Sequence, residues 1–281
     1  MKRVKIVAGV ATTLALGLAL SACGGGGTGT GTTSAAPGGS TGAGGTLYIL
    51  SGTATEHWDP QRVYVGVNIE AGNRLFTRTL TTFGPVSKDG DQSSLVADAA
   101  TDTGTASADG KTWTFTLKDG LKWQDGKAVT CEDFKYGISR TFAVDVITGG
   151  PNYAIQYLDI PKNADGSSKY AGPYKKTGQD LYDKAVTCDG NTITFKMAKP
   201  SGDFNMALTM TAFGAFREDQ DQGDKSNFAI FSDGPYMLDG EWTTNKGGTF
   251  VRNPNWDPAT DTTIRKAYPD KITWDESLTQ E

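Results

Sequence analysis

The pattern of hydrophobic and polar positions is clearest in residues 112–117, where threonine alternates with Trp113, Phe115 and Leu117. A two-residue period is typical of a β-strand that buries one face and exposes the other. The pair Asp109-Gly110 lies just before this segment and suits the tight turn of a hairpin. The pattern therefore predicts a hairpin whose apolar face covers part of a core.

The period changes from two to about four residues at Thr130. Thr130 and Asp133 fit a capping pattern in which the hydroxyl accepts a backbone N–H and the acid favours the positive end of a helix. The spacing predicts a helix that begins at Cys131. Four apolar residues would share its buried face, namely Cys131, Phe134, Ile138 and Phe142. Three polar residues would point outward, namely Glu132, Lys135 and Ser139.

Further elements are predicted on both sides of this unit. The spacing predicts strands at Leu47–Leu50, Thr192–Met197 and Lys271–Trp274, and a helix from Asn68 to Leu80. Residues 161–178 are polar and contain Gly and Lys, which predicts a loop. Helices and strands are thus interspersed along the chain, and the predicted fold class is α+β (mixed α/β).

The first 45 residues are predicted to lie outside the folded body. Residues 1–22 combine a basic start with an apolar run that is too short for a stable transmembrane helix, as in an export signal. Leu20–Cys23 resembles the lipobox of bacterial lipoproteins, which implies that Cys23 is acylated and becomes the mature N-terminus. The alternative is an ordinary signal peptide cleaved nearby. Residues 23–45 are mostly Gly, Thr, Ser and Ala, which predicts a flexible, lipid-anchored linker.

The charge balance disfavours one class of partner. Removing residues 1–22 takes three basic residues and no acid from the 27 Lys and Arg and 32 Asp and Glu of the chain. The mature chain is therefore acidic, which disfavours binding to nucleic acid. Residues 46–281 are numerous enough to bury the core of one large or two small domains.

Two cysteines remain once Cys23 is set aside, Cys131 and Cys188. An even pair in an exported chain favours a disulfide, because the extracytoplasmic space is oxidising. Cys188 precedes a turn at residues 189–191, so it lies near the end of a strand that could meet the helix of Cys131. The alternative is two buried free thiols.

An ordered series of motifs adds a family resemblance. Residues 109–134, with residues 95–98 upstream and 252–256 downstream, resemble the family 5 extracytoplasmic solute-binding proteins of ABC importers, of the oligopeptide- and dipeptide-binding type. The resemblance starts near residue 46 and spans only about the first half of a family member. It implies a two-lobe, periplasmic-binding-protein-like architecture (type II) that is incomplete, with the second large lobe missing. The implied large lobe comprises residues 46–80 and 212–281, and the implied small lobe residues 81–211.

The same resemblance suggests ligand contacts. The candidates are Tyr64, Val65, Gly66, Tyr153, Ser232, Asp233 and Gly234. Residues 64–66 match a loop that follows the ligand backbone in peptide-binding members, and residues 232–234 match a turn against the ligand. Tyr153 or Tyr157 matches a region where family members have an aromatic residue at the cleft mouth. The alternatives are a plain surface loop, a core tyrosine, and an Asp233 that accepts a backbone N–H at the start of its turn.

The resemblance implies a binding subunit rather than an enzyme. Such a lipoprotein would capture a solute, by family frequency a peptide, at the outer face of the cytoplasmic membrane and deliver it to the permease and ATPase subunits of an importer. A secreted lipid-anchored enzyme such as a glycoside hydrolase, or an adhesive or structural surface lipoprotein, are the alternatives. His57 is the only histidine, and neither G-x-S-x-G nor a Cys/His metal-ligand spacing occurs, so no catalytic residue, metal or cofactor is predicted.

The implied missing lobe affects affinity. A ligand held between two lobes loses most of its buried surface if one of them is absent. We therefore expect the 281-residue chain to bind the solute of the family weakly or not at all.

Overall fold

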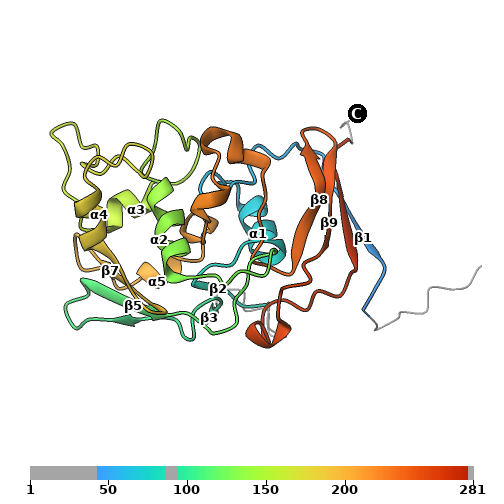
Figure 1. Ribbon diagram of the computed structural model, residues 1–281, viewed down its shortest axis with the longest axis horizontal. Coiled ribbons are helices and arrows are strands. Elements are labelled where there is room, and N and C mark those ends of the chain that lie inside the picture. Colours follow the sequence, from blue (N-terminus) through green and yellow to red (C-terminus); the bar gives the residue numbers. More distant parts are fainter. Residues whose placement is uncertain (1–42, 86–93, 278–281) are drawn as a thin grey trace, which may run out of the picture. The chain divides into compact units, whose positions relative to one another are not determined.

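The computed structural model describes residues 43–85 and 94–277 (Figure 1). The described strands are β1 (Thr46–Leu50), β2 (Thr81–Phe83), β3 (Leu95–Ala97), β4 (Thr105–Ala106), β5 (Thr112–Thr116), β6 (Val186–Asp189), β7 (Thr192–Lys196), β8 (Tyr236–Thr243), β9 (Gly247–Arg252) and β10 (Lys271–Asp275). The described α-helices are α1 (Gly66–Leu75), α2 (Cys131–Arg140), α3 (Tyr153–Tyr157), α4 (Gln179–Ala185) and α5 (Phe204–Ala207). Short 3-10 helices are η1 (Thr211–Phe213), η2 (Glu218–Gln220), η3 (Gly223–Phe228) and η4 (Pro258–Thr260). The predicted mixed α/β class is confirmed.

The predicted signal peptide and most of the predicted linker, including Cys23, lie outside the described residues. Among the described helices, none combines the length and the apolar character that a membrane span requires.

One sheet joins segments from both ends of the described chain. Its strand order is β1-β10-β9-β8, with β1 parallel to β10 and the other neighbours antiparallel. An aromatic cluster packs against it around Trp58, whose ring lies 5.2 to 5.4 Å from Phe76, Trp242 and Trp274 in edge-on contacts. Such edge-to-face contacts add stability beyond the burial of apolar area.

A second sheet carries the predicted hairpin. Its order is β4-β5-β7-β6, and all neighbours are antiparallel. Trp113 and Phe115 of β5 are buried whereas Thr116 is exposed, which confirms the predicted alternation. Helices α2 and α4 lie beside this sheet (Figure 1). Phe134 and Ile138 of α2 are fully buried in the same core.

Helix α2 begins at the predicted residue. The Thr130 hydroxyl accepts the N–H of Asp133, and the Asp133 carboxylate accepts the N–H of Thr130 at 2.8 Å, so the predicted capping box is confirmed. The prediction that Ser139 points outward is wrong, because this residue is 3% exposed. Its hydroxyl donates to the carbonyl of Tyr136 at 2.6 Å, and this bond satisfies a polar group that faces the protein interior.

A disulfide joins α2 to the second sheet. Cys131, the first residue of α2, is bonded to Cys188 of β6, and their Cα atoms are 5.8 Å apart. The bond links positions that are separated by 57 residues in the sequence. The disulfide therefore attaches the start of α2 to β6, the edge strand of the sheet beside which α2 lies.

The helix predicted over Asn68–Leu80 is only partly correct, since α1 ends at Leu75. A continued helix would use the next backbone N–H groups for its own ladder. Instead, the N–H of Arg78 donates to the carboxylate of Asp233 at 2.8 Å, and both groups are buried. A remote side chain thus replaces the helical partner, and the chain enters β2 rather than continuing as α1.

A buried ion network holds this segment to the C-terminal part of the chain. Asp98 pairs with Arg78 at 2.9 Å and with Arg265 at 2.7 Å, and Arg265 also pairs with Asp261 at 2.7 Å. Asp98 additionally accepts the N–H of Thr79 at 3.2 Å. Burial alone would raise the pKa of Asp98, but the two guanidinium groups outweigh it and hold the pKa well below its ordinary value.

The buried apolar side chains form two clusters. One draws on residues 80–215 and includes β5, β7 and α2. The other combines Trp58, Leu75 and Phe76 with residues 236–274. The predicted lobe boundaries of residues 46–80 with 212–281, and 81–211, stay a prediction.

Candidate functional site

Two segments that are remote in sequence meet at a pair of tyrosines, of which Tyr64 is exposed and Tyr153 is half-buried against the core. The hydroxyls of Tyr64 and Tyr153 are 2.9 Å apart and hydrogen-bonded, and the two rings are 6.2 Å apart. Tyr64 precedes α1, and Tyr153 is the first residue of α3. The hydrogen bond raises the pKa of Tyr64, because it favours the protonated hydroxyl. The structure therefore brings together two of the predicted contact residues that are 89 positions apart.

Arg62 holds the two loops together. Its guanidinium group donates to the carbonyls of Thr148, Val146 and Asp224 at 2.9 to 3.3 Å, and to the Thr148 hydroxyl at 2.9 Å. A charged donor that ties three separate carbonyls fixes loop backbone which has no strand partner of its own. The loop of residues 146–148 is consequently attached to the loop that carries Tyr64.

A glycine permits the close approach of the same loops. A Cβ atom at Gly150 would lie only 1.9 Å from the carbonyl oxygen of Gln61. Only a residue without a side chain can bring its backbone this near to another chain segment. The structure thus explains why glycine occupies a position just before Tyr153.

A buried arginine binds Asp59 and Gln61, which precede Tyr64 in the same loop. Arg140, at the end of α2, donates to both carboxylate oxygens of Asp59 at 2.6 and 2.7 Å and also contacts the side-chain oxygen of Gln61. It pairs with Asp221 at 2.9 Å, and its guanidinium group lies over the Phe216 ring. Sequence reasoning identified neither this residue nor Arg62, because the partners of both are distant in the sequence.

The surface around the tyrosines is hollowed and partly apolar. A depression of about 240 Å³ lies between the two loops and includes Val144 and Gly149, and a smaller one of about 40 Å³ lies beside Tyr64 and Val65 and shares Gly149. Val65, Val67 and Val144 are 48%, 66% and 62% exposed. Exposed apolar side chains beside surface depressions are typical of a surface that binds another molecule.

The other predicted contacts lie elsewhere or play another part. Gly66 is the exposed first residue of α1 and not a loop residue, and a Cβ there would meet nothing within 4 Å. Ser232 and Gly234 are buried, and the Ser232 hydroxyl donates to the Tyr236 carbonyl at 2.6 Å. Asp233 is also buried. The structure does not bring residues 232–234 together with the tyrosine pair.

Asp233 accepts a backbone N–H, but not from its own turn. The donor is Arg78, which is 155 residues away in sequence. Burial raises the pKa of Asp233 to about 7, although this backbone hydrogen bond lowers it. We interpret the carboxylate as a partner for the backbone beyond α1.

Among the described residues, no cluster of three or more His, Cys, Asp or Glu has metal-binding geometry. The Nδ1 atom of His57 is hydrogen-bonded to the side-chain oxygen of Asn227 at 2.8 Å. The tyrosine pair offers hydroxyls, an apolar surface and nearby backbone groups, which suit reversible binding.

Comparisons with curated proteins point to peptide-binding proteins. The chain is 33% identical to the Dipeptide-binding protein of Lactococcus lactis subsp. cremoris over 160 residues, which are 53% of this chain and 27% of that protein. It is 26% identical to the Dipeptide-binding protein DppE of Bacillus subtilis over 280 residues, covering 98% of this chain and 47% of that protein. The chain thus spans less than half the length of these relatives.

Solved structures and a family match agree with these relatives. The structure called Clavulanic acid biosynthesis oligopeptide binding protein 2 superposes with a TM-score of 0.75 at 32% identity, over 84% of this chain and 41% of that chain. Listeria monocytogenes OppA bound to peptide has the same fold, with a TM-score of 0.63 at 20% identity, over 82% of this chain and 42% of that chain. Residues 94–280 match the family described as bacterial extracellular solute-binding proteins, family 5 Middle. The chain therefore belongs to the family 5 bacterial extracellular solute-binding proteins.

Proposed function

We propose that the chain is the peptide-capturing component of an ABC importer and that the Tyr64–Tyr153 surface provides one wall of its peptide site. The observation that carries the proposal is the hydrogen-bonded tyrosine pair, at 2.9 Å, on a surface with exposed valines and two adjoining depressions. The relatives and structural neighbours named as dipeptide- or oligopeptide-binding proteins support the choice of ligand.

The chemistry of the surface suits an extended peptide. Apolar side chains of a peptide can cover Val65 and Val67, while its backbone groups need hydrogen-bond partners such as the two tyrosine hydroxyls. Tyr64, Val65 and Val67 are exposed to solvent on this surface, so it covers a ligand incompletely. Tight binding requires a second wall, and closure of that wall over the peptide provides the signal to a permease and its ATPase subunits.

A peptide titration followed by NMR tests the site on this chain. Tri-alanine should bind with a dissociation constant on the order of millimolar, since only one wall contacts it. The amide signals that move should be those of Val65, Gly66 and Gly149. Tyr64→Ala should weaken binding about fivefold, because it removes a stacking surface and a hydroxyl together.

The matched control is Tyr268→Ala, which removes another exposed tyrosine, 59% exposed, far along the chain from the tyrosine pair. It should leave the tri-alanine affinity unchanged. Submicromolar binding would show that the peptide site is already complete in this chain. Signal changes confined to other residues would overturn the assignment of the site.

Turnover distinguishes this function from that of a secreted hydrolase. A binding protein should leave peptides and glycans intact during prolonged incubation, and mass spectrometry should recover them unchanged. Clear hydrolysis by the purified chain, absent from a mock purification, would contradict the importer function.

Anchoring at the outer face of the cytoplasmic membrane is part of the proposal. Cys23 follows an apolar run and closes a lipobox-like tetrapeptide, which suits acylation and tethering through the glycine-rich linker. Cys23→Ala should move the chain from the membrane fraction to the medium or periplasm, or leave it with an uncleaved signal. Fractionation and mass determination check this, with Ser21→Thr as the control that retains the cysteine. Membrane retention of Cys23→Ala with the signal removed would refute lipid anchoring.

A further inference from the structure

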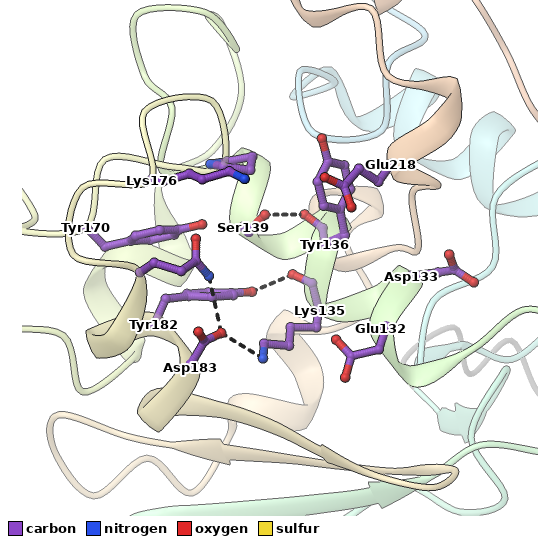
Figure 2. Close-up of a pocket in the computed structure, with 12 residues that line it drawn as sticks. Glu132, Asp133, Lys135, Tyr136, Ser139, Tyr170, Lys176, Tyr182, Asp183 and Glu218 are labelled. Atoms are coloured by element: carbon purple, nitrogen blue, oxygen red, sulfur yellow. Dashed lines mark hydrogen bonds and ion pairs between the residues drawn. The ribbon is translucent and has the colours of Figure 1, made fainter.

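A second cavity lies on another part of the chain, between α2 and the segment that leads into α4 (Figure 2). Its volume is about 330 Å³, within the range of small-molecule sites. Ser139, Tyr170 and Tyr182 are buried in its lining, and the two tyrosine rings stack 4.7 Å apart. The cavity shares no lining residue with the Tyr64–Tyr153 surface.

The cavity contains a buried polar group without a hydrogen-bond partner. Tyr170 is 1% exposed, and its hydroxyl lies near the side chains of Ser139 and Gln179 but makes no hydrogen bond of suitable distance and angle with either. In Figure 2 this hydroxyl points toward Ser139. The neighbouring Tyr182 differs, because its hydroxyl donates to the carbonyl of Lys135 at 2.6 Å. A buried hydroxyl is usually hydrogen-bonded, so an unpartnered one favours a bound group that supplies the bond.

Some charged side chains around the cavity are paired with another side chain, and others are unpaired within the described part of the chain. Lys135 is paired with Asp183 at 2.8 Å. By contrast, the side chains of Lys176, Glu218 and Glu132 are exposed and make no hydrogen bond or ion pair within the described part of the chain. In Figure 2, Lys176 lies on the side of Tyr170, and Glu218 lies across the cavity beside Tyr136. A free ammonium group thus faces the cavity from one side and a free carboxylate from the other.

We propose that this cavity binds a small zwitterion of the α-amino acid class with a polar side chain. Its carboxylate would pair with Lys176, its ammonium group with Glu218, and its side-chain hydroxyl or amide with the hydroxyl of Tyr170. A simple anion would pair with Lys176 but would also face the carboxylates of Glu132 and Glu218. A simple cation would pair with these carboxylates but would leave Lys176 without a partner. A molecule that carries both charges matches both sides, and the volume suits a single amino acid rather than an extended peptide.

Calorimetry of the purified chain with L-serine tests the site. N-acetyl-L-serine keeps only the negative charge and L-serinamide only the positive one, so each should bind about tenfold more weakly than L-serine. Lys176→Gln and Glu218→Gln should each weaken L-serine binding by about tenfold for the same reason. Tyr170→Phe keeps the stacked ring and should weaken binding about fivefold without lowering the melting temperature.

Two control variants locate the effect. Lys162→Gln removes an exposed lysine outside the cavity and should leave L-serine binding unchanged. Tyr64→Ala should also leave it unchanged, which separates this site from the proposed peptide surface. Absence of L-serine binding, equal binding of the N-acetyl or amide form, or full binding by both Lys176→Gln and Glu218→Gln would overturn the proposal.

Discussion

Replacing Asp98 with asparagine should lower the free energy of unfolding by about 3–5 kcal/mol. Asp98 is fully buried and accepts bonds from Arg78 and Arg265, both at most 2% exposed at their side chains. Asparagine presents an amide N–H₂ group where a carboxylate oxygen now accepts, and it carries no charge. Arg78 would then be buried without an ionic partner, and Arg265 would keep only Asp261.

Urea denaturation of the two proteins measures this effect. Asp239→Asn is the matched control, because Asp239 lies on β8 and is exposed. The control should change the free energy of unfolding by less than about 0.5 kcal/mol. A loss below about 1 kcal/mol for Asp98→Asn would show that the network contributes no more than an exposed ion pair.

The same variant predicts a pH dependence. The folded-state pKa of Asp98 lies well below the ordinary value of 3.8, so its contribution is present above that value and is lost as the pH falls through the folded pKa. The stability difference between the wild type and Asp98→Asn should therefore shrink as the pH falls below about 4. Asp233 titrates at higher pH, because burial and the charge of Asp98 raise its pKa to about 7, so the two proteins are compared below about pH 5. A difference that grows toward low pH would contradict this account.

Loss of the Cys131–Cys188 disulfide should reduce the free energy of unfolding by about 4 kcal/mol in the chain-entropy model. The bond closes a long loop, since the two residues are 57 positions apart, and an unfolded chain without it gains the corresponding conformational freedom. Denaturation with and without dithiothreitol measures the difference. Mass spectrometry of a non-reduced digest should recover the two cysteine peptides linked.

The double variant Cys131→Ser/Cys188→Ser is the control for the reductant. Its stability should match that of the reduced wild type and should not respond to dithiothreitol. Recovery of the two peptides unlinked from exported protein would refute the disulfide, and an equal response of the double variant would place the effect elsewhere in the chain.

Local sequence determined the helices and strands that depend on residues only a few positions apart in the chain. The alternation at Trp113 and Phe115 placed β5, and Thr130 with Asp133 placed the start of α2 at the right residue. Periodicity and capping depend on neighbours within a few positions, so they can be recognised without knowledge of the fold. Family resemblance, carried by motifs along residues 95–256, added the solute-binding class, which the match over residues 94–280 bears out.

The tertiary structure alone decided features whose partners are far apart in the chain. α1 ends early because the carboxylate of Asp233 accepts the N–H of Arg78, and no local pattern announces a partner 155 residues away. Likewise, Arg62 binds backbone carbonyls. Every residue type has a backbone carbonyl, so the sequence does not indicate which ones Arg62 binds. Sequence periodicity thus determined the helices and strands, whereas buried charges and backbone carbonyls decided where they end and which side chains share a surface.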